Sequence, residues 1–265
     1  LPFDQINVVQ GDTDRVQTGG GTGGSKSMML GGAALKHASE AIIEKGKKVA
    51  AHMLEAAESD IEFADGTFSI VGTDRRLTIG EVAAASKDQA NLPAGMDAGL
   101  DTRAGSDVDS GTYPNGCHVC ELEIDRDTGN VALLSYVVVD DFGKVINPLL
   151  VAGQVHGGIV QGVGQVLMED CVYDKESGQL VTGSYMDYAM PRADNFPTFT
   201  LDFNEVLCKT NPMGIKGAGE AGTVGALGCV TNALVNALQD MGIKHVEMPA
   251  TAERLWRLMD EAKAA

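Results

Sequence analysis

The chain has 265 residues, of which 44% are hydrophobic and 22% are charged, so its composition is that of an ordinary soluble globular protein. The formal net charge of −17 argues against general binding to nucleic acid or to an anionic membrane surface, because both would repel the chain. The strongest apolar run, residues 132–139, is much shorter than the ~18 residues that a membrane helix needs. No signal peptide is visible, and we expect a cytoplasmic protein without a membrane span.

The chain begins LPFDQINVV, without a starting Met, and enters an apolar run almost at once. We expect a fragment or a processed subunit of a larger protein. The alternative is that only a few residues have been trimmed.

The cysteines are odd in number, which fits free thiols in a reducing compartment. Cys117 and Cys120 form a Cys-x-x-Cys pair within CHVCELEID, which has the pattern of a strand. Residues three apart on a strand point to opposite faces, so the two sulfurs are badly placed to share a metal. No second pair completes a zinc site, and we expect buried free thiols here.

The first elements in chain order are a strand, a glycine-rich loop and a helix. The strand is expected at 6–12, the loop at 17–29, and the helix from Ser27 to about Glu55. The start of this helix carries no charge and should be buried, whereas its second half is charged and should face water.

A hairpin is expected at 61–72, where two alternating runs flank Asp65-Gly66. Thr78 should open a short helix, with Glu81 completing a capping box. Residues 88–116 are rich in Gly, Asp, Asn and Pro and read as a long loop that contains a lobe boundary.

The second half of the chain mixes strands and helices in blocks. We expect a hairpin, a helix, a strand, a glycine-rich turn and two further helices at 117–143, 148–174, 198–208, 211–226, 227–242 and 251–265. This order favours an α+β fold with mixed or antiparallel sheets, hairpins and long packed helices, in place of a doubly wound sheet. The two lobes are expected at 1–112 and 113–265.

The loop QTGGGTGGSKSMM raises two nucleotide hypotheses, and both fail on detail. A triphosphatase loop needs Gly immediately before Lys, but Ser25 precedes Lys26. The pattern G-x-G-x-x-G of nicotinamide dehydrogenases occurs here and again at 217–222. However, a Rossmann turn leaves its strand directly into a helix, and Glu220 lies inside the second match, where it would repel phosphates. What remains is an anion site formed by the N–H groups of 23–27, or a helix start that simply packs against glycines.

Glu220 lies among small residues just before an uncharged helix. Flanking glycines would let a substrate approach, which suits a general base. The alternative is an acidic residue placed to interact with the helix dipole.

The segment QVHGGIVQGVGQ at 154–165 is a glycine-rich helix. Each helical glycine costs ~1 kcal/mol relative to Ala, so either a second helix or a ligand must lie close to it. The polar groups that it presents are Gln154, His156 and Gln161, and His156 has no second metal ligand at a suitable spacing.

Taken together, these clusters resemble the C-terminal part of the large subunit of the molybdenum hydroxylases, the family of xanthine dehydrogenase, aldehyde oxidase and carbon monoxide dehydrogenase. The segments that carry the resemblance, in order, are GTGGSKSMMLGGAAL, CHVCELEIDRDTGNV, DDFGKVINPLLVAGQVHGGIVQGVGQ, MDYAMPRADNFP and NPMGIKGAGEAGTVGA. The resemblance runs from Ile6 to the last helix and implies the second molybdopterin-binding domain of that subunit.

The resemblance implies molybdenum held by the dithiolene of a pyranopterin, often the cytosine dinucleotide form in bacteria, with no protein side chain on the metal. Glu220 would be the catalytic base. The cofactor-binding residues that it implies are Gly23, Gly24, Ser25, Lys26, Ser27, Gln161 and Gly219.

The implied reaction is hydroxylation of an aldehyde, an N-heterocycle or a similar small substrate, with water as the oxygen source. Electrons would leave through [2Fe-2S] clusters and FAD on partner domains or subunits. The implied partners are the remainder of the large subunit, an iron–sulfur subunit and an FAD subunit. The alternatives are a non-catalytic molybdopterin-binding or assembly module and, from another class, a nicotinamide-dependent oxidoreductase.

Overall fold

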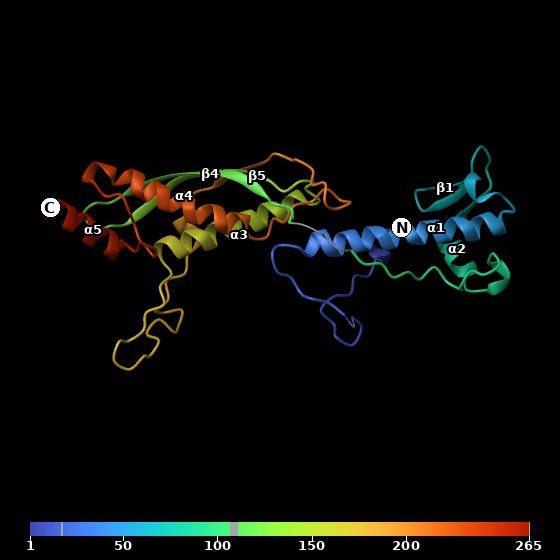
Figure 1. The fold of residues 1–265 in the computed structure, drawn as a ribbon, viewed down its shortest axis with the longest axis horizontal. Helices are drawn as coiled ribbons and strands as arrows, with labels where there is room; N and C mark the ends of the chain where they lie inside the picture. The colour runs from blue at the N-terminus through green and yellow to red at the C-terminus, as the bar shows by residue number, and fades with distance from the viewer. Residues whose placement is uncertain (17, 107–110, 265) are drawn as a thin grey trace. The chain divides into compact units, whose positions relative to one another are not determined.

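The computed structural model of the chain describes residues 1–16, 18–106 and 111–264. They form two compact units, each with its own core (Figure 1). The first unit takes the described residues of 1–22 and 30–108, and the second takes those of 23–29 and 109–265. The segment 23–29 therefore groups with the second unit, whereas the sequence analysis placed it in the first lobe; the lobe boundaries proposed there remain a prediction.

The first unit is a long helix with a small antiparallel sheet and a short helix. A π-helical turn, Met28–Gly32, leads into α1, and the sheet has the order β1-β2-β3. Its elements are α1 (Ala33–Met53), β1 (Ile61–Ala64), β2 (Thr67–Ile70), β3 (Arg76–Thr78) and α2 (Ile79–Ala85). Phe68 is fully buried in its core together with Val49 and Val82.

Local sequence signals specify this unit well. Asp65 and Gly66 both have positive φ, 48° and 77°, as the predicted tight turn of the hairpin requires. Thr78 accepts a hydrogen bond from the Glu81 N–H, and the Glu81 carboxylate accepts one from the Thr78 N–H. The predicted hairpin and capping box are confirmed.

The strand predicted at 6–12 is wrong. The structure places a 3-10 helix at Phe3–Gln5 and no strand among the described residues that follow, where Val8 is 75% exposed. A strand needs a neighbouring strand for its N–H and C=O groups, and none pairs with this run. The loop predicted at 88–116 is irregular where described, apart from Gln89–Asn91 and the start of β4, and its residues 107–110 lie outside the described chain.

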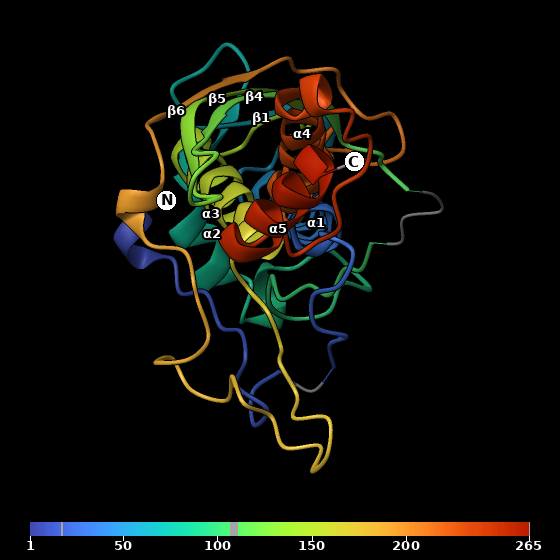
Figure 2. The ribbon, with the colours of Figure 1, turned by 90° about the vertical axis from the view of Figure 1, so that its left-hand side faces the viewer.

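The second unit contains a three-stranded mixed sheet with the order β4-β5-β6, in which β4 and β5 are antiparallel and β5 and β6 are parallel. Its strands are β4 (Asn115–Ile124), β5 (Val131–Asp141) and β6 (Phe199–Phe203). Side chains alternate along β5, so that Tyr136 and Val138 are buried while Val137 and Val139 are exposed. One face of the sheet therefore carries the core, and helices of the unit pack on that face (Figures 1 and 2).

Cys117 and Cys120 lie on opposite faces of β4, as their spacing predicts. His118 and Cys120 are half-buried on the helix side, but Cys117 is exposed on the other side, so the expectation of burial is wrong for Cys117. It fails because β4 lies in a sheet that is covered on one face only.

Three helices complete the second unit: α3 (Pro148–Leu167), α4 (Ala221–Ala237) and α5 (Ala252–Ala264). Asn147 caps α3 by accepting a hydrogen bond from the Leu150 N–H, and Pro148 occupies the first turn, where no N–H partner is needed. The helix ends at Leu167, before the predicted end at 174, because the N–H groups of Met168 and Glu169 both donate to the Gly164 carbonyl and close it. In the described part of the chain, no helix combines the length and apolarity that crossing a membrane requires.

Helices α3 and α4 approach each other so closely that glycine is required at the crossing. A Cβ added to Gly158 would lie 3.0 Å from the Cα of Gly222, and one added to Gly162 would lie 2.8 Å from the Cβ of Ala226. At Gly153 and Gly157 an added Cβ would meet nothing within 4 Å. A second helix, not a ligand, therefore accounts for Gly158 and Gly162.

Candidate functional site

The carboxylate of Glu220 lies at the start of α4, where the chain enters the helix. The hydroxyl Oγ of Ser25 donates a hydrogen bond to Glu220 Oε2 at 2.6 Å. Ser25 adopts a left-handed conformation with φ 54°, directly after Gly24 with φ 60°. This turn of the glycine loop directs the serine hydroxyl toward the acid, 195 residues further along the chain.

Two glycines let the second glycine-rich turn reach this serine. A Cβ added to Gly217 would lie 2.7 Å from the Ser25 carbonyl oxygen, and one added to Gly219 would lie 2.9 Å from Ser25 Oγ. The Gly217 N–H donates to Thr112 Oγ1 at 3.3 Å. Both glycines thus pack closely against Ser25, and a larger residue at either position would separate the two turns.

Helix α3 contributes two glutamines to the same region. Gln154 Nε2 donates to the carbonyl oxygen of Gly219 at 2.7 Å, immediately before Glu220. Thr223 Oγ1, in the first turn of α4, donates to Gln161 Oε1 at 3.3 Å. The three glycine-rich segments singled out in the sequence therefore converge around the start of α4.

A cavity of about 590 Å³ opens beside Glu220 within the second unit. Among the predicted site residues, Gly24, Ser25 and Glu220 line it. Five other predicted residues lie outside this lining: Gly23, Lys26, Ser27, Gln161 and Gly219. Lys26 is exposed, whereas Gln161 and Gly219 are held next to the acid by the contacts described above.

The cavity wall also contains polar residues that the sequence analysis did not assign to a site. Asp140, only 2% exposed, has Oδ1 at 3.3 Å from His118 Nε2. Its other oxygen, Oδ2, is buried without a hydrogen-bond partner among the described residues. Tyr113 lines the cavity with a strained φ of 48° and an exposed ring. The acidic pair at the end of the apolar run VVVDD was the available signal for Asp140.

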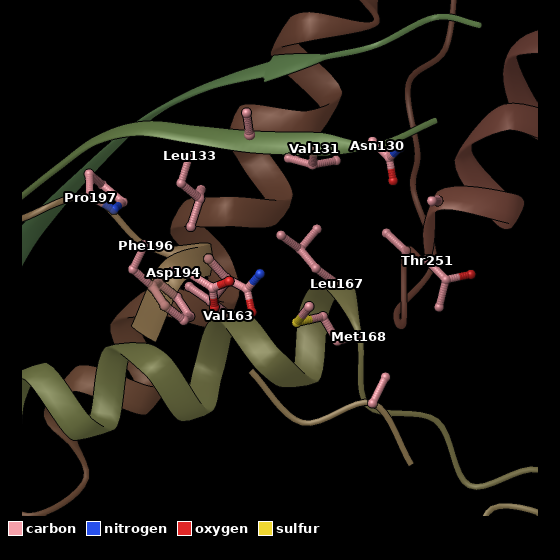
Figure 3. Close-up of a pocket in the computed structure, with 15 residues that line it drawn as sticks. Asn130, Val131, Leu133, Val163, Leu167, Met168, Asp194, Phe196, Pro197 and Thr251 are labelled. Atoms are coloured by element: carbon pink, nitrogen blue, oxygen red, sulfur yellow. The ribbon is translucent and has the colours of Figure 1, made fainter. Parts of the chain in front are cut away.

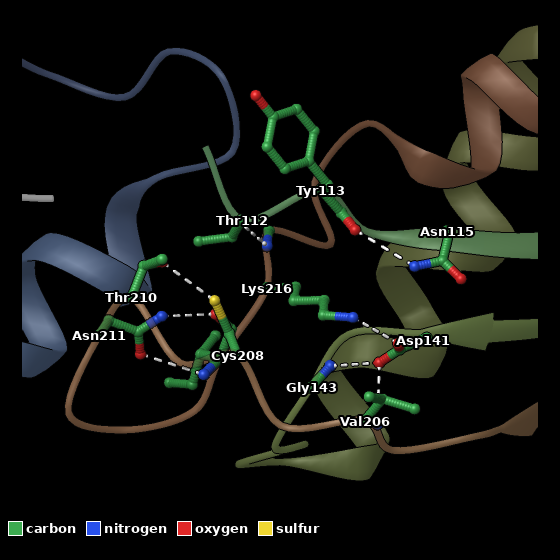
Figure 4. Close-up of polar contacts among 12 residues, drawn as sticks. Thr112, Tyr113, Asn115, Asp141, Gly143, Val206, Cys208, Thr210, Asn211 and Lys216 are labelled. Atoms are coloured by element: carbon green, nitrogen blue, oxygen red, sulfur yellow. Dashed lines mark hydrogen bonds and ion pairs between the residues drawn. The ribbon is translucent and has the colours of Figure 1, made fainter. Parts of the chain in front are cut away.

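A buried ion pair fixes the turn that leads to Glu220 (Figure 4). Lys216 Nζ lies 2.5 Å from Asp141 Oδ2, and both side chains are at most 10% exposed. Asp141 Oδ1 also accepts from the N–H groups of Gly143 at 2.8 Å and Val206 at 3.1 Å. Burial would raise the pKa of Asp141, but the hydrogen bond from Lys216 and the two backbone donors outweigh it and hold that pKa below its ordinary value.

Asn211 holds the beginning of the same turn. Its Oδ1 accepts from the N–H of Ile215 at 3.1 Å, and its Nδ2 donates to the Ile215 carbonyl at 2.8 Å (Figure 4). Lys216 is thus tied to Asp141 at the end of β5, and Ile215 is tied to Asn211. The turn is thus held by the side chains of Asp141 and Asn211.

A second cavity of about 590 Å³ lies elsewhere in the second unit (Figure 3). Its walls come from β5, the end of α3, the segment before β6 and the segment before α5, and they include Leu133, Leu167 and Phe196. None of the predicted site residues lines it.

Among the residues that the structure describes, no group of three or more His, Cys, Asp or Glu side chains is placed to hold a metal ion.

Glycine-rich turns thus converge around one acid beside a cavity. A family model described as the molybdopterin cofactor-binding domain matches residues 1–197. The chain belongs to this family, and its α+β fold and molybdopterin-binding character follow from that membership.

Similar proteins agree with this assignment. The chain is 34% identical over 266 residues to the carbon monoxide dehydrogenase large chain of Hydrogenophaga pseudoflava, covering 100% of this chain and 33% of that one. It is 38% identical over 259 residues to the nicotine 6-hydroxylase large subunit of Paenarthrobacter nicotinovorans, covering 97% and 32%. The solved structure of the carbon monoxide dehydrogenase of Oligotropha carboxidovorans superposes with a TM-score of 0.87 at 34% identity, covering 95% and 31%. The chain thus spans about a third of the length of these relatives.

Proposed function

We propose that this chain supplies the catalytic base and much of the cofactor cradle of a molybdenum hydroxylase, with Glu220 as the base. The observation that carries the proposal is the hydrogen bond from Ser25, in the first glycine loop, to Glu220, at the second. A helix-dipole role alone would require neither this hydroxyl nor the two glycines that admit it.

The glycine loop fits a bulky anionic cofactor. At Gly23 and Gly24 an added Cβ would meet no atom within 4 Å, so the loop has open space beside its backbone. Backbone N–H groups at a helix start favour phosphate oxygens. The residues that we assign to holding molybdopterin, in its cytosine dinucleotide form, are Gly23, Gly24, Ser25, Lys26, Ser27, Gln161 and Gly219. When bound, this cofactor supplies the two-electron redox chemistry that amino-acid side chains lack.

Glu220 is exposed at the cavity and can accept a proton there. Its Oε2 is held by the Ser25 hydroxyl, and we assign Oε1 as the atom that takes the proton from the oxygen nucleophile. Gly219 and Ala221 flank the acid, so no bulky neighbour of the chain blocks the approach of a reacting group. Gln154 holds the Gly219 carbonyl and so fixes the direction in which the acid points.

The substrate that we propose is a small molecule with an electron-poor carbon, such as an aldehyde or an N-heterocycle, hydroxylated with oxygen from water. Electrons would pass to [2Fe-2S] and FAD groups on an iron–sulfur subunit and an FAD subunit, and the remainder of the large subunit would close the substrate pocket. The names of the relatives, which include a large chain and a large subunit, support a multi-subunit enzyme. We propose that this enzyme is cytoplasmic.

The test is Glu220→Gln in the holoenzyme. The variant should keep its molybdenum and pterin content but lose about 10²–10⁴-fold in turnover, since that is the usual contribution of a general base. Glu123→Gln, which changes an exposed acid on β4, is the matched control and should be fully active. Near-normal turnover of the Glu220 variant would mean that Glu220 only interacts with the dipole of α4 and is not the catalytic base. A protein that contains neither molybdenum nor pterin would overturn the proposal as a whole.

A further inference from the structure

Asp140 is a buried acid whose position is fixed by both neighbouring strands. It lies on β5, the middle strand of its sheet, opposite Gly116 of β4 and Phe203 of β6. A Cβ added to Gly116 would overlap Asp140 Oδ1, so the neighbouring strand leaves out a side chain where this carboxylate lies. Only 2% of Asp140 is exposed.

His118 holds one oxygen of this carboxylate. His118 Nε2 lies 3.3 Å from Asp140 Oδ1, and His118 Nδ1 lies 2.8 Å from the Tyr136 hydroxyl. The imidazole also packs against α4, where a Cβ added to Gly225 would lie 2.5 Å from the ring. Oδ1 is thus engaged with the protein, and both ring nitrogens of His118 have a polar neighbour.

The other oxygen of the carboxylate has no such contact. Among the residues that the structure describes, Asp140 Oδ2 is a buried side-chain atom without a hydrogen-bond partner. A carboxylate oxygen that has lost its water and gained no donor destabilises the folded state. Such an atom in the wall of a cavity points to a donor that arrives with a ligand. A pair that only joined β4, β5 and α4 would have no need to leave Oδ2 unsatisfied.

Asp140 and Glu220 line the same cavity of about 590 Å³, which has the size of a pocket for a small organic molecule. Tyr113 and Val224 give it apolar walls, and the ring of Tyr113 is exposed. Such walls suit a flat ring. Five of the seven residues that we assign to the cofactor lie outside the lining, so the Asp140 side of the cavity is left for a second molecule, the substrate.

We propose that Asp140 selects substrates that carry a ring N–H, namely lactam-type N-heterocycles, by accepting that N–H at Oδ2 while the reacting carbon faces Glu220. This inference rests on the function proposed above and narrows its substrate class. An aldehyde without an N–H leaves Oδ2 unpartnered. A hydrogen bond to a charged group changes affinity about 10–100-fold, which sets the size of the expected preference.

The test compares a lactam with the lactone of the same shape. The probes are isocarbostyril and isocoumarin, which differ only in a ring N–H against a ring oxygen. Isothermal titration calorimetry on the holoenzyme, without oxygen or an electron acceptor so that turnover is prevented, measures binding alone. Wild type should bind isocarbostyril about 10–100-fold more tightly than isocoumarin. In Asp140→Ala this preference should disappear. Asp202→Ala, which removes an exposed acid of β6, is the matched control and should keep it.

Molybdenum and pterin analysis of the same preparation separates this inference from the proposed function. A loaded wild-type enzyme that binds the two probes equally, or binds neither, would overturn the role of Asp140 and leave the proposed function intact. A preference that survives in Asp140→Ala would do the same. A protein with neither molybdenum nor pterin would overturn both. The wild-type comparison decides the question even where Asp140→Ala does not fold.

Discussion

Ser25 and Glu220 are 195 residues apart in sequence, and the serine hydroxyl donates to the glutamate at 2.6 Å. The contact exists because Ser25 adopts a positive φ and because Gly217 and Gly219 have no side chains in its way. A strained residue held by its surroundings beside an acid is a frequent feature of functional sites. The contact also separates two roles for the glycine loop, namely orienting the acid and holding the cofactor.

Ser25→Ala in the holoenzyme should lower kcat about 10–100-fold, because a hydrogen bond to a charged group is worth about 1.5–3 kcal/mol. KM should change little, since the substrate does not depend on this hydroxyl for binding. Steady-state kinetics and metal analysis on the same preparation check both points. Ser39→Ala, which removes an exposed hydroxyl of α1, is the control and should change neither kcat nor the molybdenum content. A loss of molybdenum in proportion to the loss of activity would mean that Ser25 acts only by holding the cofactor and does not orient Glu220.

Gly158→Ala should destabilise the protein by about 1–3 kcal/mol, since its methyl group would overpack the α3–α4 crossing. Gly157→Ala, one position away on the same helix, meets nothing within 4 Å and should stabilise by about 0.5–1 kcal/mol. Urea unfolding of the two variants measures the difference. Equal effects at both positions would mean that the close crossing does not exist in solution.

Asp141→Asn should cost about 3–5 kcal/mol at neutral pH, because it leaves Lys216 buried without its partner. The folded pKa of Asp141 lies below its ordinary value, so the contribution is complete above about pH 4–5, which lies above the unfolded pKa. It is lost as the pH falls through the lowered folded pKa. The gap in unfolding free energy between wild type and variant should therefore shrink in acid. Asp240→Asn, which breaks an exposed pair with Arg126, should cost at most about 1 kcal/mol.

Sequence reasoning predicted the features that depend on neighbours in the chain. The turn at Asp65-Gly66, the capping box at Thr78 and the Pro148 helix start all follow from local conformational preferences. The strand at 6–12 was wrong because an apolar run does not by itself supply a partner strand.

Only some residues of the candidate site could likewise be predicted from the sequence. Glu220 and the glycine turns could be singled out because a carboxylate among glycines is unusual in any fold. Asp140 and His118 could not, because their contact requires the register of β4 on β5 and the packing of α4 on that sheet.

The crossing of α3 and α4 has a consequence for how the acid behaves with temperature. An added Cβ at Gly222 would lie 2.5 Å from the Val155 carbonyl oxygen, so the first turn of α4 rests on main chain and not on rotatable groups. Exchange between side-chain rotamers, which increases on warming, can therefore do little to loosen this contact. The backbone that carries Glu220 is therefore expected to keep its position until the second unit itself unfolds.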